Sequence, residues 1–258
     1  MNPGEYEALD RAEERHGWYL GLRDTISRVL LHPRFALPPA PRVLDAGCGT
    51  GANLRLLDQL LAPSLLAGFD QSTQAITLTR AKVPRALLWI DDLCAPAAAC
   101  APLDLVISMD VLGIPGIEQA RPGFERLVKQ LRPGGLLMLN VAAFEWLRSE
   151  HDVAGHLRRR YVAPEIRRFL VDIGLSVELL TYRVCLLFPA VVARRLARQG
   201  GTTGRPAIEA RSDFYYVPGP AQNAVLRASL TLENRALAAG FRWPWGSSIF
   251  AVGRRLRP

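Results

Sequence analysis

The sequence is poor in cysteine, in lysine and in long apolar runs. Its 258 residues include four cysteines without a Cys-x-x-Cys pair, so we expect free thiols and exclude a disulfide scaffold or zinc knuckle. The longest apolar stretches, residues 136–144 and 184–193, fall short of the roughly 20 residues that a membrane span needs. The first fifteen residues are acidic, whereas a signal peptide begins with basic and apolar residues. We therefore predict a cytoplasmic protein.

The basic residues are nearly all arginines, and they gather in the second half of the sequence. Only Lys82 and Lys129 are lysines among 32 basic residues. Residues 1–145 hold 14 basic and 16 acidic residues, and residues 146–258 hold 18 and 8. A basic half can face nucleic acid or anionic lipid. However, arginine beside abundant Ala, Gly and Pro is also typical of GC-rich bacterial coding, and we predict no nucleic-acid partner.

Short apolar strands alternate with helical patterns after a proline-rich boundary at residues 38–41. Strands are predicted at residues 42–45, 65–69, 86–90, 103–109 and 136–141. Helical spacing follows the first, second and fourth of these strands. Such alternation indicates right-handed crossovers and a parallel sheet covered on both faces.

The two ends of the chain add helices to this sheet. Residues 5–31 show one helical pattern, and residues 1–37 are predicted to form an N-terminal helical cover. The rest of the chain, residues 38–258, is predicted to be one domain. Its second half is expected to contain a helix and two further strands, with a helical insertion at about 189–245 between strands six and seven. The predicted fold class is α/β, a seven-stranded doubly wound Rossmann-like sheet.

Three glycines, Gly47, Gly49 and Gly51, lie where the first strand turns into a helix. Side chains there would keep a ligand from the backbone amides and the positive helix end. The glycines alone also fit a dinucleotide-binding loop, with Asp70 as its ribose acid. Three more features decide between these possibilities, and they are Asp45, the acid pair Asp91 and Asp92, and the Leu-Arg-Pro-Gly-Gly segment at residues 131–135.

Together these motifs resemble the class I S-adenosylmethionine-dependent methyltransferases, in the branch that carries the VLDAGCGTG sequence found at residues 43–51. The resemblance extends over nearly the whole chain. It implies S-adenosyl-L-methionine as cofactor, S-adenosyl-L-homocysteine as product, and a small-molecule acceptor, for which we expect an apolar, glycosylated or secondary metabolite. The alternatives are a cofactor-binding protein without transfer activity and an NAD-dependent oxidoreductase.

The resemblance also implies which residues hold the cofactor. In the family the glycine loop binds the methionyl part, the acid ending strand two binds both ribose hydroxyls, and the acid after strand three faces the adenine. These acids match Asp70 and, in preference to Asp91, Asp92. Ser72 or Thr73 can cap the following helix, which would leave the Asp70 carboxylate free. The predicted cofactor-binding residues are Asp45, Gly47, Cys48, Gly49, Gly51, Asp70, Gln71, Asp91, Asp92, Leu93 and Met109.

The acceptor side is less clear from the sequence. This branch often has a histidine after strand four, but here Ile114 stands there, and we interpret Asp110 as a turn former or helix cap. Two segments, residues 14–23 and 150–161, resemble parts of a sub-branch often encoded beside cell-envelope functions. They indicate His16, Tyr19, His151 and Tyr161 as acceptor-site groups, against the alternative that His16 and Trp18 only pack.

Of these, His151 is the predicted general base, oriented by Asp152, and Tyr19 is the third predicted catalytic residue. His151 and His156 are five residues apart and do not share a helical face, so we predict no metal site. The arginine-bearing helix expected near residues 188–198 could rest on a membrane surface, but we favour a lid over an apolar pocket. Aromatic residues at 214–216 and 243–245 would line this pocket or fill the core.

Overall fold

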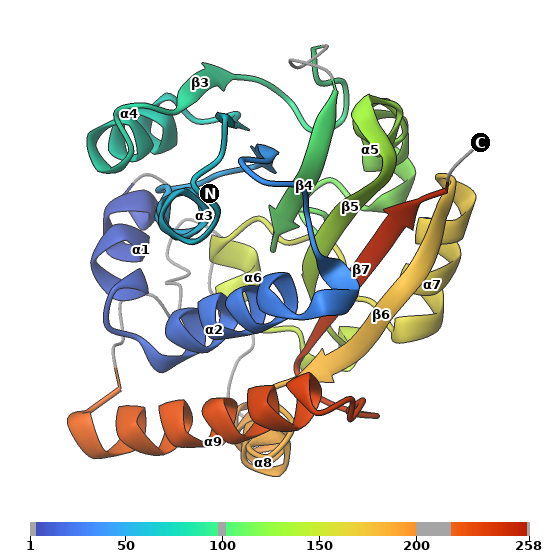
Figure 1. The fold of residues 1–258 in the computed structure, drawn as a ribbon. Coiled ribbons are helices and arrows are strands. Elements are labelled where there is room, and N and C mark those ends of the chain that lie inside the picture. The colour runs from blue at the N-terminus through green and yellow to red at the C-terminus, as the bar shows by residue number, and fades with distance from the viewer. Residues whose placement is uncertain (1–3, 98–101, 200–217, 257–258) are drawn as a thin grey trace.

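A computed structural model describes residues 4–97, 102–199 and 218–256. It shows a seven-stranded sheet flanked by helices (Figure 1). The strands are β1 (Arg42–Ala46), β2 (Leu65–Asp70), β3 (Leu87–Ile90), β4 (Leu103–Met109), β5 (Leu131–Ala142), β6 (Leu175–Arg183) and β7 (Ser248–Arg255). The helices are α1 (Glu5–Glu13), α2 (Gly17–Leu31), α3 (Ala52–Leu61), α4 (Thr73–Lys82), α5 (Ile117–Gln130), α6 (Glu150–Ala154), α7 (Ala163–Asp172), α8 (Phe188–Gln199) and α9 (Pro220–Ala238), with short 3-10 turns η1 (Pro33–Phe35) and η2 (Glu145–Leu147).

The strand order is β3-β2-β1-β4-β5-β7-β6. Strands β1 to β5 pair in parallel, and β7 lies antiparallel between β5 and β6. The order reverses between β1 and β4, and in open α/β sheets ligands bind at the carboxyl ends of the strands beside such a switch point. The predicted seven-stranded doubly wound fold class is confirmed.

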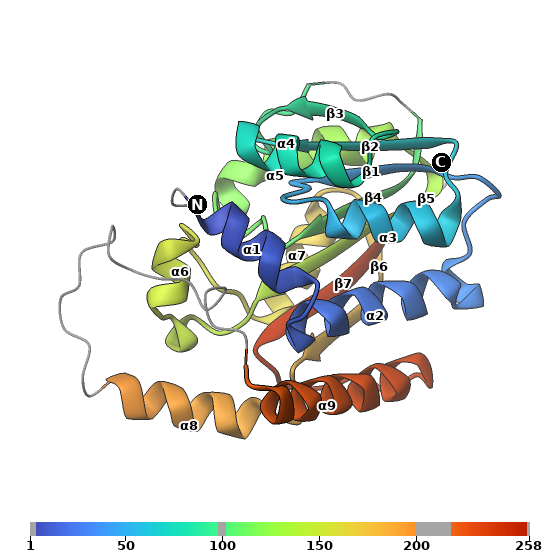
Figure 2. The ribbon, with the colours of Figure 1, turned by 90° about the vertical axis from the view of Figure 1, so that its left-hand side faces the viewer.

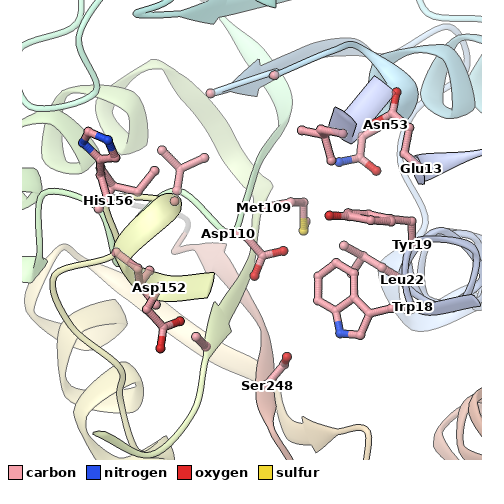
Figure 3. Close-up of a pocket in the computed structure, with 18 of the residues that line it drawn as sticks. Glu13, Trp18, Tyr19, Leu22, Asn53, Met109, Asp110, Asp152, His156 and Ser248 are labelled. Atoms are coloured by element: carbon pink, nitrogen blue, oxygen red, sulfur yellow. The ribbon is translucent and has the colours of Figure 1, made fainter. Parts of the chain in front are cut away.

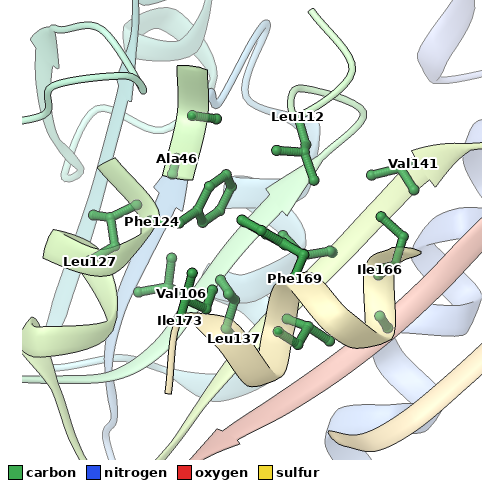
Figure 4. Packing of buried hydrophobic residues seen from close by; sticks show 14 of the residues in the cluster. Ala46, Val106, Leu112, Phe124, Leu127, Leu137, Val141, Ile166, Phe169 and Ile173 are labelled. Atoms are coloured by element: carbon green, nitrogen blue, oxygen red, sulfur yellow. The ribbon is translucent and has the colours of Figure 1, made fainter. Parts of the chain in front are cut away.

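Hydrophobic side chains leave the sheet on both faces and form two core clusters. Leu44 of β1 belongs to the same cluster as Phe124 of α5 and Phe169 of α7 on one face, and Figure 4 shows these two rings in the cluster with Ala46 of the same strand. The preceding residue, Val43, joins the opposite cluster together with residues of α2, α3 and α9. Successive residues of a strand point to opposite faces, so the continuous apolar run of β1 is explained by helices on both sides.

The N-terminal cover consists of two helices instead of the single predicted helix. The helical conformation is interrupted between Glu13 and Gly17. There His16 adopts an extended conformation, and its Nδ1 accepts a hydrogen bond from Trp18 N at 3.1 Å. A side-chain acceptor that satisfies a free amide starts a new helix. Helix α1 crosses one end of α2 (Figure 2), and α2 packs against α9.

The connection between β6 and β7 contains α8 and α9, as the helical patterns predict. Strand β6 ends at Arg183. Val184 has a φ of 60°, and the next two amides, Cys185 N and Leu186 N, donate to Glu233 Oε1 at 2.7 and 2.8 Å. The aromatic residues at 214–216 lie outside the described residues. Among the described helices, none is long and apolar enough to span a membrane.

Candidate active site

A cavity of about 790 Å³ opens at the carboxyl ends of the parallel strands. Its walls come from the loops after β1, β2, β3 and β4 and from helices of the N-terminal cover, α6 and the insertion. Figure 3 shows Met109 and Asp110 in its centre, with Trp18 and Tyr19 on one side and Asp152 and His156 on the other. The sheet topology therefore collects residues from distant parts of the sequence into one site.

The glycine loop is fastened to β2 by its own backbone. Gly47 N and Cys48 N both donate to Phe69 O, at 2.8 and 2.9 Å. At Gly47 and Gly49 the backbone is left-handed, with φ of 87° and 55°, which favours glycine. A Cβ on Gly49 would find no atom of the described chain within 4 Å. The loop thus leaves room for a ligand against its backbone.

Asp45 ends up directly beneath this loop and away from the cavity. It is 1% exposed, and neither of its carboxylate oxygens has a hydrogen-bond partner among the described residues. Burial, together with the nearby charge of Asp70, raises its pKa well above the usual range. A buried carboxylate without partners is costly, and this one would be compensated by positive charge bound in the loop.

Asp70 joins the glycine loop to the start of α4. Its Oδ2 accepts a hydrogen bond from Gly49 N at 3.0 Å, and its Oδ1 accepts from Ser72 N at 3.0 Å and from the Tyr6 hydroxyl at 3.4 Å. Ser72 caps α4 as expected, through Ala75 N, but the expectation that this leaves the Asp70 carboxylate free is wrong. Burial raises the pKa of Asp70, and the two backbone donors oppose that rise.

The two acids after β3 differ in their hydrogen bonds and in their exposure. Asp91 accepts hydrogen bonds at both oxygens, from Trp89 Nε1 and Ala97 N at Oδ2 and from Asp92 N at Oδ1. Asp92 is exposed, accepts a hydrogen bond at Oδ1 from Cys94 N, and also interacts with the Cys94 thiol. Its greater exposure favours Asp92 over Asp91 as a group that contacts a ligand.

Most of the residues predicted to bind cofactor line the cavity. They are Gly47, Cys48, Gly49, Asp70, Gln71, Asp91, Asp92, Leu93 and Met109. Asp45 and Gly51 do not line it. Gly51 instead precedes α3 with a φ of 88°, and a Cβ there would lie 2.8 Å from the Thr79 side chain, so its glycine permits close packing of α3 on α4.

The three residues predicted to be catalytic have different surroundings. Tyr19 lines the cavity beside Trp18, with ring centroids 4.9 Å apart. The backbone of His151 lies in α6, but its side chain is outside the described part of the structure. The Asp152 carboxylate borders the cavity and pairs with Arg160 through both oxygens, at 2.8 and 3.0 Å.

This pairing changes the interpretation of Asp152. Its Oδ2 also accepts a hydrogen bond from Ser149 N at 2.8 Å, and both members of the ion pair are buried. Such a bidentate contact fixes the turn around α6. Tyr161 is likewise structural, because it is 1% exposed in the core and its hydroxyl accepts a bond from Ile117 N at the start of α5.

Sequence reasoning missed the importance of Asp110. It follows β4 with a φ of 63°, lines the cavity, and its Oδ1 accepts a hydrogen bond from Asn140 Nδ2 at 2.8 Å. Burial raises its pKa to about 6, while Asn140, Arg183 and Arg160 act in the opposite direction. Its place at the end of a strand beside the glycine loop was the available signal.

The insertion and the N-terminal cover supply apolar walls. Leu187 and Val191 lie at the start of α8, and Leu226 lies in α9. Trp18 and Leu22 reach the same space from α2. The prediction that the insertion covers an apolar pocket agrees with these contacts, and Trp18, for which sequence reasoning favoured packing, is also a wall of the cavity.

Comparison with known proteins finds a family match for the first half of the sheet. Residues 43–135, from β1 to the start of β5, match the family model described as "Methyltransferase domain". The chain is 33% identical over 132 residues to the biotin biosynthesis bifunctional protein BioCD of Bordetella avium, which covers 50% of this chain and 28% of that protein. It is 32% identical over 109 residues to trans-aconitate 2-methyltransferase of Variovorax paradoxus, covering 42% of this chain and 41% of that enzyme.

The fold extends further than these sequence matches. N-methyltransferase NodS of Bradyrhizobium japonicum superimposes with a TM-score of 0.56, at 15% identity, over 98% of each chain. In sequence, however, the chain spans less than half the length of the two curated relatives. Residues 43–135, which match the family model, contain the glycine loop and the acids after β2 and β3.

Proposed function

We propose that this chain transfers a methyl group from S-adenosylmethionine to a small molecule, and that both bind in the cavity described above. The family model that matches residues 43–135, together with the fold, supports a class I S-adenosylmethionine-dependent methyltransferase. One observation carries the proposal. A single cavity joins the glycine loop and the strand-end acids to an apolar space under the insertion. Its volume of about 790 Å³ is near the upper end of the range of roughly 300 to 1,000 Å³ for ligand pockets.

The residues of the loop side suit the cofactor. The open space at Gly49 would take the methionyl part against the backbone. Burial disfavours the ionised form of the Asp45 carboxyl group, and a ligand that carries an ammonium and a sulfonium in the loop would stabilise that form. Asp70 would bind the ribose, where a ribose hydroxyl would replace the weak contact of Tyr6 at 3.4 Å. Asp92, which lies exposed after β3, would face the adenine.

The acceptor would occupy the space between the centre of the cavity and the insertion. Its walls include Trp18, Leu22, Leu187 and Leu226, and aromatic and aliphatic walls favour an apolar or ring-bearing molecule. We therefore propose an apolar, glycosylated or secondary metabolite as acceptor. The covering helices would also keep water from the reacting atoms.

The main task of the protein in this reaction is alignment. The bound cofactor supplies a methyl carbon that its sulfonium already activates. The glycine loop and Asp70 fix one reactant, and the apolar walls hold the other against it. Orientation of this kind contributes roughly 7 to 11 kcal/mol to catalysis in favourable cases, so the proposal needs no metal ion.

Titration calorimetry with S-adenosylmethionine and S-adenosylhomocysteine tests the cofactor site. We expect both to bind, and Asp70→Asn to weaken binding by roughly tenfold to a hundredfold, since a hydrogen bond to a charged group contributes about 1.5 to 3 kcal/mol. Asp172→Asn is the matched control, because Asp172 is exposed and pairs with Arg121 on the outer surface. Binding of NAD instead of either compound would overturn the proposal.

A second measurement separates a methyltransferase from a cofactor-binding protein without transfer activity. The protein is incubated with methyl-labelled S-adenosylmethionine and a protein-free extract of bacterial metabolites, and label is followed into new small molecules. Transfer is expected. Tight cofactor binding without transfer to any component of extracts from several sources would favour the non-catalytic alternative.

A further inference from the structure

Asp110 is the only residue of β4 and its following turn that brings a carboxylate into the cavity. It directly follows Met109, the last residue of β4, and Figure 3 shows its carboxylate pointing into the central space between Met109 and Asp152. The backbone there is left-handed with a φ of 63°. A non-glycine residue in this conformation is uncommon and costs energy, so the surrounding structure must hold it in place.

Hydrogen bonds from β5 provide this support. Asp110 N donates to Asn140 O at 2.8 Å, and Asn140 Nδ2 donates to Asp110 Oδ1 at 2.8 Å. Asn140 is itself fully buried. Oδ2 of Asp110 has no donor among the residues that the structure describes. One oxygen is thus anchored, and the other can contact a ligand.

A buried polar network in turn orients Asn140. Arg183 Nη1, at the end of β6, donates to Asn140 Oδ1 at 3.2 Å, and Arg183 Nε donates to Thr25 Oγ1 of α2 at 3.0 Å. Arg183 is 2% exposed, and its guanidinium lies 5.8 Å from the centre of the Trp18 ring. An Asn140 amide held in this way can only present its NH2 group to Asp110, which fixes the direction of the carboxylate.

The other carboxylates at the cavity are engaged elsewhere. Glu13 pairs with Lys82, and Asp152 pairs with Arg160. Asp70 and Asp91 accept hydrogen bonds from the backbone at their own turns. Asp92 interacts with the backbone and thiol of Cys94 and lies exposed after β3, on the side of the proposed nucleoside. Among the described residues, Asp110 is the carboxylate that combines an available oxygen with a central position.

The charged groups around Asp110 leave it ionised at neutral pH. Burial raises the pKa of Asp110 to about 6, and Arg183 and Arg160 limit that rise. Arg183 has a pKa lowered by burial to about 10 and so remains positively charged near pH 7, and Arg160 is paired with Asp152. A carboxylate with these properties is close to the optimum for accepting a proton under physiological conditions.

We propose that Asp110 is the general base of the methyl transfer and that the acceptor is a hydroxyl compound. The inference rests on the proposed function. As the hydroxyl oxygen forms its bond to the methyl carbon, its proton moves to Oδ2 of Asp110. The methyl–sulfur bond breaks with its electron pair remaining on sulfur, so the products are a methyl ether, a neutral thioether and protonated Asp110.

The position of Asp110 also excludes one class of acceptor. A carboxylate nucleophile carries no proton at neutral pH and needs no base, and a second negative charge beside Asp110 would be repelled. An aromatic hydroxyl suits the site, because the neighbouring walls are Trp18, Met109 and Val111. The acceptor would therefore differ in class from the tricarboxylate named in the trans-aconitate relative.

The experiment follows methyl label from S-adenosylmethionine into a metabolite extract and, in parallel, into simple phenols such as catechol and caffeate. Products are treated with mild alkali, which hydrolyses methyl esters and leaves ethers intact, and are then assigned by NMR. We expect an alkali-stable methyl ether. Asp110→Asn should lower kcat by roughly 10²- to 10⁴-fold, and wild-type kcat/KM should fall tenfold per pH unit below about pH 6.

Two controls keep the outcome specific. S-adenosylhomocysteine binding to Asp110→Asn should stay within threefold of wild type, which shows that the protein is folded and the cofactor site intact. Asp104→Asn is the matched substitution, because Asp104 is a buried carboxylate at the opposite end of the same strand, bonded to Arg42 N and Arg132. It should leave kcat and the pH profile unchanged.

The possible failures are distinguishable. An ester or N-methyl product, or an Asp110→Asn variant with kcat and acid limb close to wild type, would overturn the inference while leaving methyl transfer intact. Absence of both cofactor binding and label transfer in the wild-type protein would overturn the proposed function itself.

Discussion

Adding one methyl group to the glycine loop should give opposite results at two positions that are only two residues apart. Gly47 and Gly49 both have left-handed backbones and both line the cavity. Their surroundings differ, because a Cβ on Gly47 would collide with the Val111 side chain, whereas a Cβ on Gly49 would find no atom of the described residues within 4 Å. Substitution by alanine therefore separates the structural function of the loop from its proposed binding function.

Gly47→Ala is expected to lower stability. A left-handed backbone costs an alanine about 1 to 2 kcal/mol, and overpacking against Val111 adds roughly 1 to 3 kcal/mol. Part of this is offset by the reduced freedom of alanine in the unfolded chain, by about 0.4 to 1 kcal/mol. The net loss of about 2 to 4 kcal/mol corresponds to a decrease in Tm of roughly 4 to 16 °C for a chain of this size.

Gly49→Ala is expected to preserve the fold and weaken cofactor binding. The backbone cost of about 1 to 2 kcal/mol is again partly offset in the unfolded state, which leaves a decrease in Tm of only a few degrees, about 2 to 4 °C. The added methyl group would occupy the space proposed for the methionyl part. We expect at least a tenfold increase in the Kd for S-adenosylhomocysteine, or about 1.4 kcal/mol.

Thermal unfolding without ligand and calorimetry with S-adenosylhomocysteine measure the two effects. The double variant Gly47→Ala/Val111→Ala serves as a control and should lose less Tm than the sum of the losses of the two single variants, since it removes the collision. The reasoning is refuted if Gly49→Ala binds the ligand as tightly as wild type, or if Gly47→Ala melts at the wild-type temperature.

Two further predictions concern buried carboxylates. Asp152→Ala leaves the buried Arg160 without its ion-pair partner and should lower the free energy of unfolding by about 3 to 5 kcal/mol in denaturant titrations. Asp172→Ala, at an exposed ion pair, should lower it by less than about 1 kcal/mol. Equal losses in the two variants would contradict the structural assignment of Asp152. Asp110→Asn should raise the stability of the free protein by about 2 kcal/mol at pH 7, after allowance for screening, because the folded-state pKa of Asp110 is raised from 3.8 to about 6 and its ionised form is disfavoured. The wild type loses this stability as the pH rises from about 4 through 6, so the difference between the two proteins should vanish near pH 4, and a difference independent of pH would show that the cause is not ionisation.

Some parts of the site are each formed within one short segment of the chain, and these parts could be predicted from the sequence. The glycine loop and the acids after β3 directly follow a strand, and Asp70 is the last residue of one. In a parallel sheet the strand ends meet at one edge, so the local pattern places them together. The same holds for α8 and α9, where helical spacing alone indicates the elements.

The contacts that depend on distant partners could not be predicted. Asp110 resembles a turn residue until Asn140 and Arg183, from two other strands, are seen to orient it. Asp152 looks available to a neighbouring imidazole until Arg160, eight residues later, is seen to engage both of its oxygens. In both cases the decisive hydrogen bonds arise from tertiary folding, to which periodicity and spacing are insensitive.

The distribution of charge around the cavity connects stability with function. Burial raises the pKa of both Asp45 and Asp110, so ionisation of either carboxyl group in the free protein carries an electrostatic cost. The Asp152 carboxylate is instead compensated by its ion pair with Arg160, which fixes the turn around α6. A positively charged ligand would reduce the electrostatic cost at Asp45 and Asp110 and leave the ion pair of Asp152 unchanged. Because a ligand that binds only the folded state stabilises it by about 2.7 kcal/mol at a hundred times its Kd, occupation of the loop by a cationic donor would offset the cost that these two carboxylates impose on the free protein.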